Sequence, residues 1–159
     1  MAEKTIDIAS PILSRNERLA DQLRQRFKET NTYVINVLSS PGSGKTTTIL
    51  GTNERLRDKA GLRCAVIEGD IASDVDAITM KEAGMPAIQI NTGGLCHLEG
   101  NMIMEAVDAF DQAVGLENID VIFIENVGNL VCPVDFDLGE NLSLSLIHIS
   151  EPTRLQLIS

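Results

Sequence analysis

The feature that most constrains this chain is the glycine-rich segment SSPGSGKT at residues 39–46. It lies between a short β-rich run at 33–38 and a stretch of helical character at 45–59, which is the context of a phosphate-binding Walker A loop. Gly42 and Gly44 can adopt backbone angles that other residues resist. The free amides and the positive dipole end of the following helix would point at the same anion. The segment therefore predicts a nucleotide-phosphate site.

The loop residues have separate expected roles. Lys45 would neutralise the β- and γ-phosphates, and the Thr46 hydroxyl would hold Mg²⁺. Ser39 stands where the consensus has glycine, but Gly-Lys-Thr is in register. The alternative is a glycine-rich turn that happens to precede a helix. The residues that we expect to contact the nucleotide are Pro41, Gly42, Ser43, Gly44, Lys45, Thr46 and Thr47.

Strand-like and helical segments alternate along the rest of the chain. We expect strands over 33–38, 64–68, 87–90 and 121–124, and helices over 45–59, 73–83 and 98–114. Buried strands made of continuous apolar residues and separated by helices indicate a parallel sheet. The pattern predicts an α/β fold of the P-loop NTPase type, with a mostly parallel sheet and helices on both faces.

A further helix is expected at the N-terminus, after a loose leader over 1–13 in which Pro11 is a break. Ser14 and Glu17 have the spacing of a capping box, so we expect the helix to begin there. Leu23 and Phe27 continue an apolar stripe that predicts packing on the domain. The alternative, a basic recognition helix, would use the arginines that lie mostly off this stripe.

Composition and charge restrict the partners. The chain has 159 residues, enough for one domain, with 13 basic and 23 acidic side chains and a net charge of −10. This balance disfavours nucleic acid and an anionic membrane as partners. No apolar run approaches the roughly 20 residues of a membrane helix, and the N-terminus lacks a signal-peptide core. Three cysteines cannot all pair, which favours free thiols or metal ligands in the cytoplasm.

Two acidic residues follow predicted strands at the edge where the phosphate loop is expected. Asp70 comes two residues after the 64–68 strand, and Glu125 directly follows the 121–124 strand. Either could bind Mg²⁺, directly or through water, or orient a nucleophilic water; the alternative is a solvated loop carboxylate. Glu125 also opens an acidic-x-x-Gly segment, in which the Gly128 amide could sense a γ-phosphate. For Glu68 we favour the solvated carboxylate over a role in the site.

A second group of residues has metal-binding chemistry. Cys96 and His97 are adjacent after a Gly-Gly turn, and Cys132 lies beyond the acidic segment. Thiolate and imidazole are ligands of Zn²⁺ and Ni²⁺. Three ligands are too few for a closed structural site, so a fourth would come from water or a second subunit. The alternative is a buried thiol and a histidine at a helix start. Cys64 lies inside an apolar strand and is expected in the core.

Together these pieces resemble the hydrogenase-maturation nickel-insertion GTPases of the HypB family. The resemblance runs from about Ser10 to about Asn141. A phosphate loop alone fits many families, but Cys-His after a Gly-Gly turn together with ENVGNLVCP is specific to this one. The matching segments are SSPGSGKTT (39–47), IEGDI (67–71), NTGGLCHLE (91–99), FIENVGNLVCP (123–133) and DFDLGE (135–140).

The resemblance implies a SIMIBI-type G domain that hydrolyses GTP to GDP and phosphate and dimerises when GTP is bound. It also implies that the protein works with HypA and hands nickel toward the large subunit of [NiFe]-hydrogenase. Hydrolysis would loosen the metal, because nucleotide draws together the ligands of two subunits. By motif, Lys45, Asp70 and Glu125 are catalytic; Thr46, Asp70 and Glu125 hold Mg²⁺; Cys96, His97 and Cys132 hold Ni²⁺ or Zn²⁺.

The chain also departs from the family pattern. It lacks the family's cysteine-rich and histidine-rich nickel segments and the Asn-Lys-x-Asp motif that reads guanine. From about Ser143 it reads LSLIHISEPTRLQLIS, which we interpret as a translated sequencing adapter joined to a truncated gene; the alternative is a genuine short variant whose tail forms one strand. We therefore divide the chain into a leader and helix (1–31), a truncated GTPase domain (32–142) and a non-family tail (143–159). We expect weak or no GTPase activity and poor stability, because an interrupted sheet exposes an edge.

Three other functions compete with this one. A urease-type metallochaperone GTPase would carry Cys-Pro-His where this chain has Leu95-Cys96-His97. A P-loop ATPase would differ in base specificity. A non-catalytic metal-binding scaffold would dimerise with metal whether or not Lys45 is intact.

Overall fold

The structure is a computed structural model that describes residues 9–69 and 79–147. Two sequence predictions therefore fall wholly or partly outside these ranges. Asp70 is not among the described residues, and of the helix expected over 73–83 the described part shows helix at 79–82.

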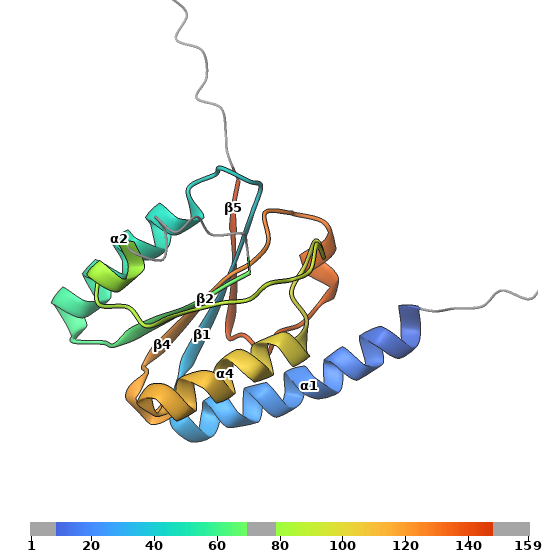
Figure 1. Cartoon of the computed structure of the whole chain (residues 1–159), viewed down its shortest axis with the longest axis horizontal. Helices are drawn as coiled ribbons and strands as arrows, with labels where there is room; N and C mark the ends of the chain where they lie inside the picture. Colours follow the sequence, from blue (N-terminus) through green and yellow to red (C-terminus); the bar gives the residue numbers. More distant parts are fainter. Residues whose placement is uncertain (1–8, 70–78, 148–159) are drawn as a thin grey trace, which may run out of the picture.

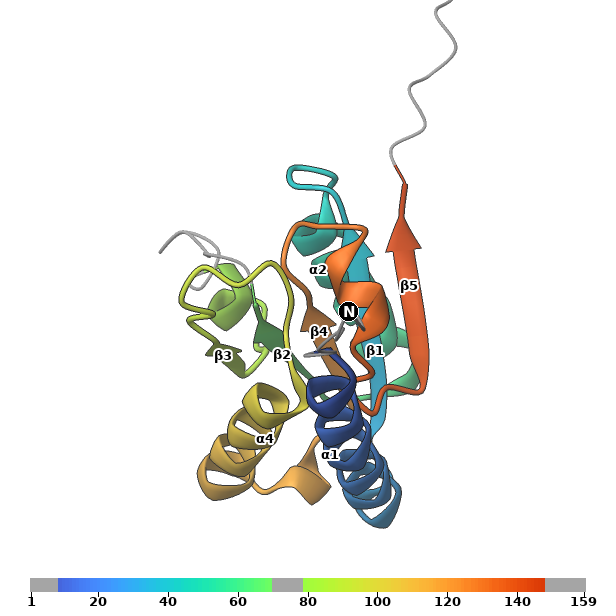
Figure 2. The ribbon, with the colours of Figure 1, turned by 90° about the vertical axis from the view of Figure 1, so that its right-hand side faces the viewer.

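Within the described residues, one sheet of five strands forms the centre of the molecule, and every pairing in it is parallel. The strand order is β3-β2-β4-β1-β5, so the first strand of the chain lies near one side of the sheet (Figure 2). Because the strands are parallel, their carboxyl ends and the loops that follow them share one edge. The strands are β1 (Tyr33–Ser39), β2 (Cys64–Glu68), β3 (Ala87–Gln89), β4 (Val121–Glu125) and β5 (Leu142–Leu146).

Helices cover both faces of this sheet (Figures 1 and 2). Helix α2 (Lys45–Ala60) lies on one face, and α1 (Ala9–Thr30) and α4 (Gly100–Val114) lie side by side on the other. Two short 3₁₀ helices lie on either side of β4 in the sequence, η1 (Leu116–Asn118) before it and η2 (Cys132–Asp135) after it. The predicted α/β architecture is confirmed.

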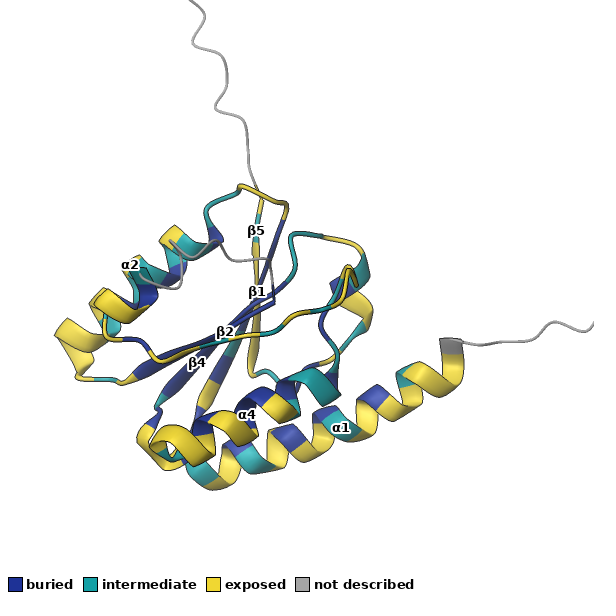
Figure 3. Cartoon of the chain, viewed as in Figure 1, coloured by how far each residue is buried: buried dark blue, intermediate teal, exposed yellow. Residues whose placement is uncertain are grey.

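The core forms on both sides of the sheet because alternate residues of each buried strand point to opposite faces. In β2, Ala65 and Ile67 pack with the cluster under α1 and α4, whereas Val66 packs with the cluster under α2. The same division holds in β4, where Ile122 and Phe123 lie in different clusters. Figure 3 shows these strands as the buried centre between the helices. In the described part of the chain, no helix is both long and apolar enough to span a membrane.

The N-terminal helix begins earlier than we predicted. It starts at Ala9, so the capping-box pair Ser14 and Glu17 lies inside the helix and part of the expected loose leader is helical. Pro11 falls in the first turn, where a proline is tolerated because the backbone amide there has no partner within the helix. The predicted packing is confirmed, since Leu23 and Phe27 are fully buried.

Helix α4 begins later than we predicted, at Gly100 and not at Leu98. Glu99 has extended backbone angles, and the Gly100 amide donates to Oδ1 of Asn16 on α1 at 2.7 Å. The cap of α4 therefore comes from another helix. Local sequence could not reveal this, because capping rules consider only the residues that precede a helix.

Strand β5 pairs with β1 along residues 142–146 and forms one side of the sheet. It crosses the boundary that we placed at residue 143, so 143–146 pair with β1 in the sheet. Leucine and serine alternate over Leu142–Leu146, and this period of two suits a strand. Most of β5 is exposed, and its outer edge has no neighbouring strand within the described residues.

Candidate functional site

The phosphate loop connects the end of β1 to the start of α2, as predicted. Gly42 and Gly44 have φ of +71° and +89°, backbone angles that residues with a side chain rarely adopt. A Cβ atom at either position would meet no atom within 4 Å, so it is the backbone conformation, and not the space, that requires glycine. The Ser43 hydroxyl donates to the Ser40 carbonyl at 2.8 Å and holds the turn. The first amides of α2 therefore point into an open loop, as anion binding requires.

The structure brings together two residues that we predicted for Mg²⁺. The Thr46 hydroxyl donates to Oε1 of Glu125 at 3.0 Å, and Glu125 is 7% exposed. Mg²⁺ is bound by oxygen ligands together with substrate phosphates, so the hydroxyl and carboxylate oxygens of this pair fit the ion. Lys45, in the same turn of α2, is 5% exposed. Asp70, the third predicted ligand, lies outside the described residues.

Glu125 has an acidic neighbour on the adjacent strand. In the register of β2 and β4, Glu68 is paired with Glu125, and Glu68 is 2% exposed. Both residues therefore lie at the carboxyl edge of the sheet. Among the other predicted nucleotide-binding residues, Pro41 and Thr47 are exposed and Ser43 is partly buried.

The segment after Glu125 runs back to the phosphate loop. Asn126 is fully buried, and its amide donates to the carbonyl of Val37 on β1 at 3.1 Å. Three residues later, Asn129 forms an isolated antiparallel bridge with Ser39, the first residue of the phosphate-loop motif. Gly128, which we predicted as a γ-phosphate sensor, is thus next to a residue that pairs with the loop.

The two predicted cysteine ligands lie together although their loops follow different strands. The Cys132 thiol lies close enough to the Cys96 thiol to raise the pKa of Cys96 above its ordinary value. Cys96 is exposed and Cys132 partly buried, and both are free thiols. Cys64, by contrast, is buried in β2, and its desolvation raises its pKa to about 11, as befits a core residue.

His97 lies beside this pair, with contacts at both ring nitrogens. Its Nδ1 is 3.6 Å from the Cys96 sulfur, and its Nε2 is 3.2 Å from Oε1 of Glu99. The ring stacks on Phe136, with centroids 3.9 Å apart and an interplanar angle of 18°. The 91–99 loop and the segment after η2 therefore meet at His97.

These side chains do not form a finished metal centre. Among the residues that the structure describes, no group of three or more His, Cys, Asp or Glu side chains is placed so that it could hold a metal ion. The structure brings the predicted ligands into one neighbourhood without closing them around a point. Ligand chemistry and proximity fit a soft or borderline metal such as nickel or zinc, and coordination would require the ligands to move.

Sequence reasoning missed three residues that shape this site. Asn129 contacts both the phosphate loop and Cys132, Glu99 contacts the His97 ring, and Phe136 stacks on it. The role of Asn129 in its turn could have been predicted from the sequence. Asparagine side chains in turns commonly accept a hydrogen bond from a backbone amide a few residues later. The contacts of Phe136 depend on the meeting of two distant loops, and no local pattern reports them.

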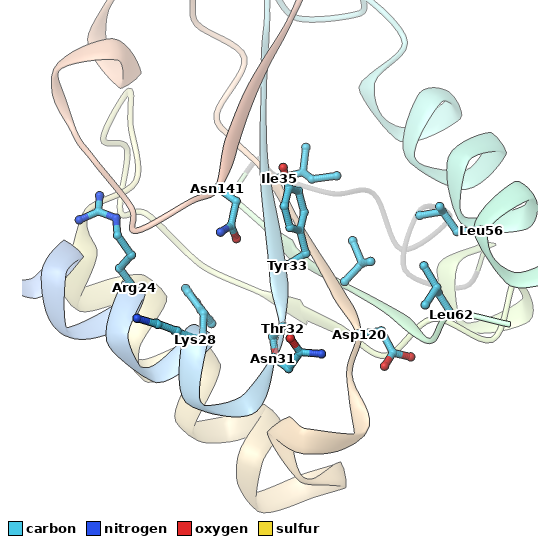
Figure 4. A pocket seen from close by; sticks show the side chains of 12 residues that line it. Arg24, Lys28, Asn31, Thr32, Tyr33, Ile35, Leu56, Leu62, Asp120 and Asn141 are labelled. Carbon is cyan, nitrogen blue, oxygen red and sulfur yellow. The ribbon is translucent and has the colours of Figure 1, made fainter. Parts of the chain in front are cut away.

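A cavity of about 700 Å³ lies at the opposite end of the sheet (Figure 4). It is lined by the end of α1, the start of β1 and the residues before β4, among them Lys28, Tyr33 and Asp120. These are the amino ends of the strands, away from the phosphate loop. The cavity is therefore separate from the predicted nucleotide site.

Comparisons with known proteins agree with this arrangement. The profile of the CobW/HypB/UreG nucleotide-binding domain matches residues 33–146. The hydrogenase/urease maturation factor HypB of Helicobacter hepaticus is 42% identical over 149 residues, which are 94% of this chain and 60% of the relative. The hydrogenase maturation factor HypB of Escherichia coli K12 is 43% identical over 148 residues, 93% of this chain and 49% of the relative. The chain thus spans about half to three fifths of the length of these relatives.

Solved structures give the same assignment. HypB from Archaeoglobus fulgidus superposes with a TM-score of 0.75 and 37% identity, covering 84% of this chain and 62% of that one. HypB from Helicobacter pylori in complex with nickel superposes with a TM-score of 0.72 and 40% identity, covering 82% and 59%. The match of one family profile to most of the chain and the agreement in fold lead to one conclusion. The chain belongs to the CobW/HypB/UreG nucleotide-binding-domain family and resembles its HypB members.

Proposed function

We propose that this chain is a GTP-binding metallochaperone switch that assists nickel insertion into [NiFe]-hydrogenase. The observation that carries the proposal is that two cysteine loops meet at the edge of the sheet that also carries the phosphate loop. Nucleotide and metal would then occupy neighbouring places, and a change in one could reach the other. The relatives named as hydrogenase maturation factors, and the relative solved with nickel, support the choice of cargo.

In this proposal the phosphate loop binds the nucleotide through the amides at the start of α2 and through Lys45. Lys45 supplies positive charge to the β- and γ-phosphates, and Glu125 accepts a hydrogen bond from the Thr46 hydroxyl. Thr46, Glu125 and Asp70 would hold Mg²⁺, which neutralises phosphate charge when bound. Gly128 would respond to the γ-phosphate, since the next residue pairs with Ser39.

The metal cargo would be taken by Cys96, His97 and Cys132, with a further ligand from water or from a second copy of the chain. We include in the proposal a GTP-dependent homodimer, HypA and the hydrogenase large subunit as partners. We also place the protein in the cytoplasm, where free thiols persist. Nickel and zinc differ little in their demand for thiolate and imidazole, so zinc is included as a bound metal.

The experiment is a metal titration of the purified chain and of two substituted forms. Cys132→Ala and Cys96→Ala should each reduce Ni²⁺ affinity, because each removes a thiolate ligand. Cys64→Ala is the matched control, since that thiol is buried in β2. Unaltered nickel stoichiometry and affinity in both ligand variants would contradict the metal assignment.

Base selection is the weaker part of the predicted activity. The sequence contains no Asn-Lys-x-Asp motif, so we propose low guanine selectivity and weak hydrolysis. Protection against thermal unfolding by GTP, compared with ATP at the same concentration, measures the selectivity. Strong, guanine-selective hydrolysis by the purified chain would contradict this part of the proposal.

A second candidate, delivery of nickel to urease, has one observation in its favour. The Helicobacter hepaticus relative is named as a hydrogenase and urease maturation factor. Activation of apo-hydrogenase and apo-urease by the nickel-loaded chain would distinguish the two destinations.

A further inference from the structure

Resting on the proposed function, we infer that Asn129 is the positioning residue that couples the phosphate loop to the metal ligand Cys132. Asn129 joins the two through separate groups of one residue. Its backbone pairs with Ser39, which is fully buried and begins the phosphate-loop motif. Its side-chain Nδ2 donates to the Cys132 sulfur at 3.4 Å.

The same side chain also fixes the backbone that carries this thiol. Oδ1 of Asn129 accepts the amide of Val131 at 2.8 Å and the amide of Cys132 at 3.3 Å. Thus Asn129 holds both the loop and the sulfur, while its own main chain is tied to β1. Six residues lie between Glu125 and Cys132, and without such a tie a loop of this length could absorb a shift of the phosphate loop.

The Cys96 loop has a different anchorage. Leu98 is fully buried, and the Gly100 amide that follows the loop is capped by Asn16 on α1 at 2.7 Å. At the start of this loop, Oδ1 of Asn91 accepts a hydrogen bond from the Gly93 backbone amide at 3.0 Å, a contact within the local turn. The loop follows β3, which is separated from β1 by β2 and β4. A movement at the phosphate loop would therefore displace Cys132 relative to Cys96 and change how well the two thiols share a metal.

This coupling has a direct thermodynamic signature. If nucleotide alters the metal affinity by some factor, metal must alter nucleotide affinity by the same factor. Position between two sites does not prove coupling, so the test is the loss of that factor in a variant that still binds each ligand. A residue with a merely structural role would lower both affinities and leave the factor intact.

The experiment measures Ni²⁺ affinity of the chain with and without a saturating, non-hydrolysable GTP analogue and Mg²⁺. In wild type, the Ni²⁺ affinities with and without the GTP analogue are expected to differ by a ratio of about fivefold or more. Asn129→Ala should bring this ratio to within about twofold of unity, whereas the control Asn91→Ala should retain it. The sulfur-to-nickel charge-transfer absorption should also shift in Asn129→Ala, because a donor to the sulfur is lost.

Asn129→Asp keeps the interpretation clear if the alanine variant is unstable. The carboxylate can still accept the Val131 amide but cannot donate to the Cys132 sulfur, so this variant should melt like wild type and still lose the ratio. A ratio in Asn129→Asp within about twofold of that of wild type would overturn the inference while leaving the proposed function intact. A wild-type chain that binds both ligands without any ratio would overturn the proposed switch together with the inference.

Discussion

Cys96 and Cys132 lie on loops that are held by different parts of the molecule. The Cys96 loop ends at the start of α4, where the Gly100 amide donates a hydrogen bond to Asn16 on α1. The Cys132 loop starts at Glu125, pairs with Ser39 and returns beside β1. One thiol is therefore fixed to the helical scaffold and the other to the nucleotide edge. We propose that a metal shared between them would respond to nucleotide, because Asn129 ties Cys132, and not Cys96, to the residue that begins the phosphate loop.

The Cys132 loop is also tied to the core by a chain of amides. The buried Asn126 donates through Nδ2 to Oδ1 of Asn36 at 3.1 Å, and Nδ2 of Asn36 donates to Oε1 of Glu140 at 3.2 Å. Oε2 of Glu140 accepts the Leu138 amide at 2.9 Å. Both ends of the segment from 126 to 140 are thus attached to β1, the strand that leads into the phosphate loop.

The largest expected effect comes from Lys45→Ala, which removes the charge at the nucleotide side of this comparison. We expect nucleotide affinity to fall by about 100-fold or more, since a preorganised phosphate contact is lost. Protection of the chain by GTP against thermal unfolding measures the change. Nickel affinity without nucleotide should stay as in wild type, because Lys45 is not one of the predicted metal ligands. Metal-dependent dimerisation that still responds to nucleotide in this variant would favour the scaffold alternative.

The two cysteines provide the next largest effect. Cys96→Ser and Cys132→Ser should each weaken Ni²⁺ binding at least about tenfold, because even loss of an outer contact to a metal ligand has that effect. Isothermal titration with Ni²⁺ compares them directly. A loss confined to one of the two variants would show that the thiols do not share a metal.

A smaller effect is expected where the Cys96 loop meets the scaffold. Asn16→Ala removes the cap of Gly100 and the 2.7 Å hydrogen bond from Nδ2 to the Asp137 carbonyl. We expect a loss of about 1 kcal/mol in the free energy of unfolding, the usual size for a helix cap. Denaturant titration measures it, with Asn101→Ala in the same turn of α4 as the control. Equal stability of Asn16→Ala and wild type would remove α1 as the anchor of this loop.

The smallest effect concerns the opposite end of the sheet, where no nucleotide response is expected. Asp120 accepts hydrogen bonds from the side chain and the backbone amide of Arg63, and these lower the pKa of its carboxyl group. A lowered pKa in the folded state stabilises the fold above the unfolded value of about 3.9. This contribution is lost as the pH falls through the folded pKa.

Asp120→Asn should therefore reduce the acid dependence of the denaturation midpoint below about pH 4. The ion pair is largely exposed, so the change should be small. Nickel affinity and its response to nucleotide should remain at the wild-type values. A variant with the same acid profile as wild type would show that this pair does not contribute to the pH dependence.

The sequence predicted those parts of the molecule that depend on local patterns. The run at 64–68 is a strand with these bounds, because four apolar residues precede Glu68 and the run lies between Gly61 and Gly69. Helix α2 ends at Ala60, one residue beyond the predicted end, because Gly61 takes the left-handed conformation that closes a helix. The phosphate loop likewise depends on contiguous residues, and its glycines have the angles that the motif requires.

Predictions failed where a distant residue decides the local structure. The capping-box spacing at Ser14 suggested a helix start, yet the helix begins at Ala9 and Ser14 is one of its inner residues. The start of α4 depends on Asn16, 84 positions away in the sequence. For the predicted metal ligands, the cysteine and histidine residue types indicated metal-binding chemistry at the carboxyl edge of the sheet. The contact of Asn129 with Ser39 could not be predicted, because it depends on how the segment after β4 lies against the end of β1.

We propose that the nucleotide and metal sites at one edge of the sheet are coupled. The most direct measurement is the Ni²⁺ dissociation constant of the chain, determined without nucleotide and with a saturating non-hydrolysable GTP analogue and Mg²⁺. We predict that the two constants differ by about fivefold or more. Equal constants, with both ligands demonstrably bound, would show that the two sites are not coupled.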